Sequence, residues 1–108
     1  MSEVFLARIG NSDSPAAIAA GIATLWQRAG LATVFEARDL AAVKLHVGEP
    51  GTKTFLRPEV VAPLVAQVAA TGAKPFLTDT AVLYRSPRDN AVTHVGVARD
   101  HGFTVEAV

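Results

Sequence analysis

Ionisable side chains follow two apolar runs of this chain. Lys44 and His46 alternate with apolar residues in VKLHV, and Asp79 follows KPFLT between Thr78 and Thr80. Alternate side chains of a strand point to opposite faces, so Lys44 and His46 share one face. An imidazole and an ammonium beside a carboxylate can exchange a proton or stabilise negative charge near neutral pH. These residues, Lys44, His46 and Asp79, are therefore predicted to form a catalytic centre; a structural polar network is the alternative interpretation.

The segments after these runs are long and rich in groups that bind ligands. GEPGTKTFLR (48–57) and DTAVLYRSPR (79–88) exceed the usual length of about two to six residues between a strand and a helix. Guanidinium groups beside a helix start favour carboxylates and phosphates, which predicts a small anionic ligand. The predicted ligand-binding residues are Glu49, Gly51, Arg57, Thr78, Thr80, Tyr84, Arg85, Arg88, Asn90 and His94.

Several other chemistries do not fit the pattern. GEPGTKT is not a nucleotide-binding phosphate loop, because two residues rather than four separate its glycines and a threonine precedes the lysine. The chain has no cysteine, which excludes disulfides and thiolate metal sites within it. A divalent metal held by His46, Glu49 and Asp79 is an alternative, because hard or borderline ions accept these ligands. His101 is interpreted as structural or exposed.

Length and composition favour a single domain, residues 1–108. Ten basic and ten acidic residues give no net charge, which disfavours nucleic acid or an anionic membrane as a partner. No signal peptide and no membrane-spanning run is predicted, so a cytoplasmic protein is expected.

Strands and helices alternate in the predicted order β-α-β-α-β-α-β. Strands are expected at Glu3–Arg8, Leu40–Val47, Lys74–Thr78 and Phe103–Val108, and helices from Pro15, Pro58 and Asp89 or Asn90, with a kink or restart at Pro63. This order predicts a three-layer, Rossmann-like or flavodoxin-like α/β fold with a mostly parallel, four-stranded sheet. Ligands of such sheets bind at the carboxyl ends of the strands. The open sheet suggests an incomplete domain that is covered by a second copy or by a downstream part of the protein.

The chain also resembles a known family from VKLHV to its last glycines. The matching pattern is Lys44, His46, Gly48, Glu49, Gly51, Arg57-Pro58, Thr78-Asp79-Thr80, Leu83-Tyr84, Arg88, Asn90-Ala91, His94 and His101-Gly102-Phe103. It is similar to the domain of unknown function 362, whose members are often joined to ferredoxin-type iron–sulfur modules. The resemblance implies the ligand-binding part of an iron–sulfur-associated, redox-linked enzyme, with any cluster held by a downstream iron–sulfur domain. The alternatives are a non-catalytic interaction or homo-oligomerisation module and a metal-dependent hydrolase.

Overall fold

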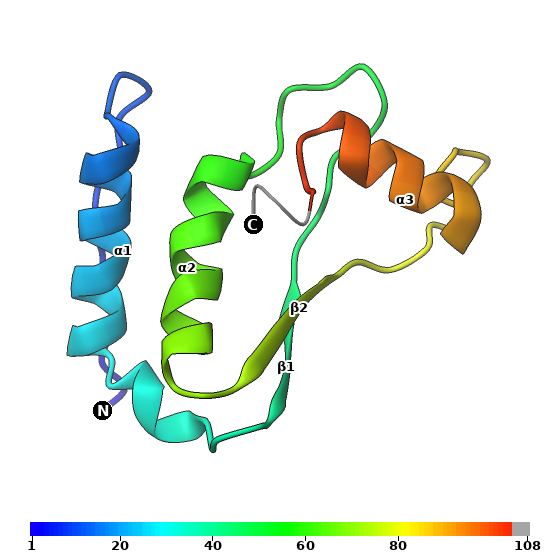
Figure 1. Ribbon diagram of the computed structural model, residues 1–108. Coiled ribbons are helices and arrows are strands. Elements are labelled where there is room, and N and C mark those ends of the chain that lie inside the picture. Colours follow the sequence, from blue (N-terminus) through cyan, green and yellow to red (C-terminus); the bar gives the residue numbers. More distant parts are fainter. Residues whose placement is uncertain (105–108) are drawn as a thin grey trace.

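The computed structural model describes residues 1–104 and shows a mixed α/β arrangement (Figure 1). Its elements are α1 (Pro15–Arg28), the short 3-10 helix η1 (Leu31–Val34), β1 (Leu40–Lys44), α2 (Pro58–Ala70), β2 (Lys74–Thr78) and α3 (Ala91–Asp100). None of the helices in this part of the chain is long and apolar enough to cross a membrane.

The two strands lie parallel and side by side. β1 pairs with β2 in a register that runs from Leu40 opposite Lys74 to Lys44 opposite Thr78, and Leu45 N–H extends the ladder by donating to Thr78 O. Because the strands are parallel, both carboxyl ends meet at one edge, where the chain enters the long segments 45–57 and 79–90. The sheet thus places the two predicted polar segments together.

Each α-helix begins at, or one residue after, a start that the sequence predicts, whereas the short helix η1 was not predicted. Ser14 caps α1 through a hydrogen bond from Ala17 N–H, and Asn90 caps α3 by accepting from Val92 N–H and Thr93 N–H. α2 begins at Pro58, where a missing N–H costs nothing.

Of the two outcomes predicted at Pro63, a kink or a restart of the helix, the restart is not observed. The helix is continuous from Pro58 to Ala70 with Pro63 inside it. The proline removes only the bond to the carbonyl of Glu59, an exposed residue in the first turn, so water can solvate that carbonyl.

Two apolar clusters hold the elements together. One joins Leu45, Val47, Val61, Val97 and Phe103, and so packs the end of β1 against α2 and α3. The other joins Trp26, Ala41, Val68 and Ala73 and packs α1 and α2 against the start of β1. The first cluster fixes α3 beside the carboxyl edge of the sheet.

The predicted four-stranded sheet is not observed in residues 1–104. Residues 3–8 are extended but pair with no strand, and they run along α1 (Figure 1). Phe103 and Thr104 are not in a strand, and the rest of the predicted fourth strand lies outside the described residues. The strand predicted at Leu40–Val47 ends at Lys44, where the chain turns toward α3. An alternating pattern of apolar residues indicates only that a segment has β propensity. The segment forms a strand where it also has the edge of another strand to pair with.

One face of the sheet has no helix over it among the described residues. Ala42, Lys44 and Phe76 on this face are exposed, whereas Ala41 and Leu45 on the other face are buried. The three-layer arrangement expected from the sequence is therefore not seen here. Lys44 belongs to this open face, whereas β1 ends before His46.

Candidate functional site

Arg88 is the centre of the polar cluster at the carboxyl edge. Its side chain is only 2% exposed, although it belongs to an irregular segment between β2 and α3. Nη2 donates to Asp79 Oδ2 at 2.9 Å and Nη1 donates to Glu49 Oε1. Arginine is almost never fully buried unless it is paired. The two carboxylates, one from each long segment, provide that pairing.

Three donors keep Asp79 ionised. Burial raises the pKa of this carboxyl, but hydrogen bonds from Val47 N–H (3.2 Å) and Thr80 N–H (2.8 Å) and the Arg88 guanidinium together bring its pKa below the usual value. The Asp79 side chain is 6% exposed. A buried carboxylate that remains charged is a fixed acceptor for a neighbouring donor.

Glu49 ties the two long segments together. It accepts hydrogen bonds from Tyr84 Oη and from Ser86 Oγ (2.9 Å), as well as from Arg88. These contacts, led by the Tyr84 hydrogen bond, lower the pKa of Glu49, and the same bond raises the pKa of Tyr84. Glu49 is the more accessible of the two carboxylates, with a side chain 28% exposed.

Two imidazoles complete the cluster. His46 Nε2 lies 3.1 Å from Arg88 Nη1, and His46 Nδ1 accepts from Gly48 N–H at 2.9 Å. His94 Nε2 lies 3.3 Å from Asp79 Oδ2 and 3.4 Å from Arg88 Nε. A protonated His94 Nε2 can donate to Asp79, and an unprotonated one can accept from Arg88. Both protonation states of this nitrogen therefore have a partner.

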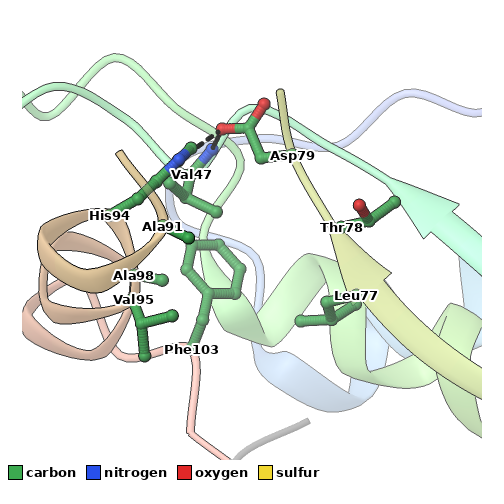
Figure 2. Close-up of a pocket in the computed structure, with 9 residues that line it drawn as sticks. All are labelled: Val47, Leu77, Thr78, Asp79, Ala91, His94, Val95, Ala98 and Phe103. Carbon is green, nitrogen blue, oxygen red and sulfur yellow. Dashed lines mark hydrogen bonds and ion pairs between the residues drawn. The ribbon is translucent and has the colours of Figure 1, made fainter. Parts of the chain in front are cut away.

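A cavity of about 300 Å³ opens beside the cluster (Figure 2). Its polar wall is formed by Thr78, Asp79 and His94. The remaining lining is apolar and consists of Val47, Leu77, Ala91, Val95, Ala98 and Phe103. Figure 2 shows β2 and α3 on opposite sides, the Phe103 ring between them, and Asp79 and His94 at one rim. The cavity lies where parallel sheets commonly bind ligands.

A stacked pair of rings fixes the first long segment against α3. Phe55 and His101 stack with centroids 4.4 Å apart, and His101 Nδ1 lies 2.7 Å from Val47 O. Gly48 passes beneath these rings with φ of 94°. A Cβ at this position would lie 2.5 Å from Phe55, so the site requires glycine here. This packing sets the position of Glu49, the next residue.

The structure brings together six of the predicted residues: His46, Glu49, Asp79, Tyr84, Arg88 and His94. Thr78 lines the cavity, Thr80 supports Asp79 through its backbone, and Asn90 caps α3. Lys44 is not part of the cluster: it is exposed and has no ion pair with a residue of the described chain. Arg85 and Gly51 are exposed as well.

Arg57 lies at a different place. It is the N-cap residue of α2 and lines a wide surface depression of about 660 Å³ with Lys53 and His101. Arg57 and Arg88, which the sequence grouped as anion-binding residues, therefore belong to separate surfaces, and the Arg88 donors are already engaged by carboxylates.

Sequence reasoning missed Ser86, Val47 and Phe103. Ser86 bonds Glu49 and also accepts from Arg88 N–H, Val47 donates its backbone N–H to Asp79, and Phe103 walls the cavity. Val47 and Phe103 act through a backbone group and an apolar ring, which no motif of chemically active residues indicates. Ser86 lies between Arg85 and Arg88, whose guanidinium groups are the stronger signal for an anionic ligand.

A metal centre is not preformed in the part of the chain that the structure describes. No group of three or more His, Asp or Glu side chains there is placed to hold an ion. The Arg88 guanidinium lies where His46, Glu49 and Asp79 converge.

The site lies in a part of the chain that matches a known family. The family model described as Domain of unknown function (DUF362) matches residues 41–108. The chain belongs to this family. All the residues of the polar cluster and the cavity lie inside the DUF362 match, whereas α1 and the extended N-terminal segment precede it. No curated protein and no solved structure shows significant similarity to the chain.

Proposed function

We propose that this DUF362 chain is the ligand-binding part of an enzyme and that it binds a small anionic molecule with an apolar body in the cavity between β2 and α3. The observation that carries the proposal is the pairing of an apolar cavity with the Asp79–His94 wall, which buried Arg88 holds in place. Ligand sites are typically apolar pockets with a few fixed polar groups. The apolar body would pack against Leu77, Val95 and Phe103.

An anionic head group is favoured by the first turn of α3 and by His94. Among the described residues, Asp79 is the one carboxylate that lines the cavity, and its ion pair with Arg88, which Arg88 shares with Glu49, offsets part of its charge. The first turn of α3, which includes Ala91 and His94, lines the cavity and contributes the positive end of the helix dipole. A protonated His94 would add a charge-assisted hydrogen bond to a carboxylate or phosphate oxygen.

His94 is also the residue that we expect to exchange a proton with the ligand. Its Nε2 has a partner in either protonation state, because it can donate to Asp79 when protonated and accept from Arg88 Nε when not. Asp79 would orient the ring, and Arg88 would be a positioning residue. His46, on the outer side of Arg88, is a second candidate for proton exchange.

The iron–sulfur part of the proposal rests on the family resemblance. No cysteine occurs in the 108 residues, so this chain offers no thiolate ligand for a cluster. Any cluster would belong to another segment or partner, and the role of this chain would be to present the ligand to it. Of the other two candidates, the metal-dependent hydrolase is the less favoured, because Arg88 fills the place where the metal would be bound.

An NMR titration with benzoate, phenyl phosphate and inorganic phosphate tests the ligand site. We expect benzoate and phenyl phosphate to shift the amides of Val47, Leu77 and Val95, and inorganic phosphate to bind more weakly because it has no apolar body. His94→Gln should weaken binding by about 10- to 150-fold, the value of one charge-assisted hydrogen bond. Val92→Ala, on the exposed side of α3, is the matched control. Absence of site-specific shifts with all three probes, or unchanged affinity in His94→Gln, would contradict the proposal.

A further inference from the structure

The N-terminal segment, residues 3–8, has the pattern of a strand without a strand partner. Val4 and Leu6 are 90% and 82% exposed, whereas Ala7 approaches Gly21 of α1. None of the backbone groups of these residues hydrogen-bonds to another described residue. Alternation of this kind is typical of a strand with one apolar face left uncovered. The segment therefore exposes both apolar side chains and unpaired backbone groups.

β1 has a free edge with the complementary features. Among the described strands it pairs only with β2, and Leu45 N–H points toward β2. Backbone groups alternate between the two edges of a strand, so those of Ala42 and Lys44 point to the free edge. The consecutive residues Val43, Lys44 and Leu45 line an apolar cavity of about 300 Å³ between α1, α2 and β1.

One antiparallel register matches the segment to this edge along its whole length. It places Glu3 opposite Lys44, Val4 opposite Val43, Phe5 opposite Ala42, Leu6 opposite Ala41, Ala7 opposite Leu40 and Arg8 opposite Asp39. Opposite charges meet at both ends, and Val4 and Leu6 fall on the face that carries the apolar cavity. The same six residues in the parallel direction place Glu3 opposite Asp39 and Arg8 opposite Lys44, which are like-charged pairs.

We propose that residues 3–8 of one copy add as an antiparallel strand to the free edge of β1 in a second copy, so that two chains exchange their N-terminal segments. The chain's own segment runs in the same direction as β1: in Figure 1 it rises along α1 from the N-terminus to the loop that precedes this helix, and β1 rises in the same sense. An antiparallel pair within one chain would require Arg8 to lie at the start of β1, at the opposite end from Pro15. A second copy meets no such constraint. Reciprocal exchange pairs both free edges and covers both exposed apolar faces.

Charge reversal tests the register. Sedimentation equilibrium of the full chain should give twice its mass of 11.3 kDa. Glu3→Lys and Lys44→Glu should each weaken the dimer by about 2- to 30-fold, because each reversal affects two symmetry-related pairs. The double variant Glu3→Lys/Lys44→Glu should recover the affinity. A monomeric wild-type chain, or a double variant no tighter than the single variants, would overturn the proposal.

Disulfide trapping tests which chain supplies the strand. The chain has no cysteine, so a Val4→Cys sample mixed with a Val43→Cys sample can form only introduced disulfides. These positions would be a non-hydrogen-bonded pair with Cα atoms about 4.5 Å apart, within the range for a disulfide. We expect a cross-linked heterodimer, which should not form when Val92→Cys replaces Val43→Cys. If a chain carrying both cysteines at positions 4 and 43 closes an internal disulfide at high dilution and the mixture gives no heterodimer, the segment pairs within its own chain and the exchange is refuted.

Discussion

Replacing Arg88 with methionine is the most direct test of the polar cluster. Methionine has a similar length and fills the same space but offers no donor to Asp79 or Glu49. In Arg88→Met the Asp79 carboxylate, 6% exposed, would keep its backbone donors but lose its only ion-pair partner of fixed charge. Removing one member of a buried ion pair costs about 3–5 kcal/mol. Glu49 is accessible enough to be hydrated once its contact with Arg88 is lost, so no further cost is added for this residue.

This cost is large compared with the stability of a small domain, about 5–15 kcal/mol. Urea unfolding followed by Trp26 fluorescence measures it, because the single tryptophan is buried and stacks on Phe35. With a slope of about 1–3 kcal/mol/M, the midpoint should fall by about 1–5 M. Arg85→Met is the matched control: an exposed arginine in the same segment, whose replacement should change stability by less than about 0.5 kcal/mol.

Two outcomes would refute the reasoning. One is a loss below about 1 kcal/mol in Arg88→Met, or a loss equal to that of Arg85→Met. The other is simple additivity in the double variant Arg88→Met/Asp79→Asn. We expect the double variant to be more stable than additivity predicts, because removing the Asp79 charge abolishes the penalty of leaving it unpaired.

Two further predictions use the same unfolding assays. Gly48→Ala should cost about 1–3 kcal/mol or more, because its Cβ would meet Phe55, whereas Gly51→Ala has open space around it and should cost less; equal losses would contradict the packing. The carboxyls of Glu49 and Asp79 have folded pKa values below their unfolded ones, so their contribution is complete above about pH 4.5 and is lost as pH falls through the lower folded values. The thermal midpoint should therefore drop below about pH 4, and a midpoint unchanged down to pH 2 would exclude this role.

The sequence by itself determined the local elements and the edge at which the site lies. Ser14-Pro15, Arg57-Pro58 and Asn90 marked the helix starts, because caps and first-turn prolines act within a few residues of chain. The polar residues after VKLHV and KPFLT indicated the carboxyl edge, because any two parallel strands bring their ends together. His46 and Asp79 were placed near each other by the same argument.

Only the tertiary structure decided which charged groups meet. Lys44 and Arg88 carry the same charge and both lie in the matched family region, yet Arg88 is buried between two carboxylates while Lys44 faces the open side of the sheet. Periodicity gives the face of a side chain but not whether another element covers that face. For residues 3–8 the pattern predicted a strand, but in the described residues this segment pairs with neither β1 nor β2. Strand pairing and burial depend on contacts between distant segments, and therefore cannot be inferred from local patterns alone.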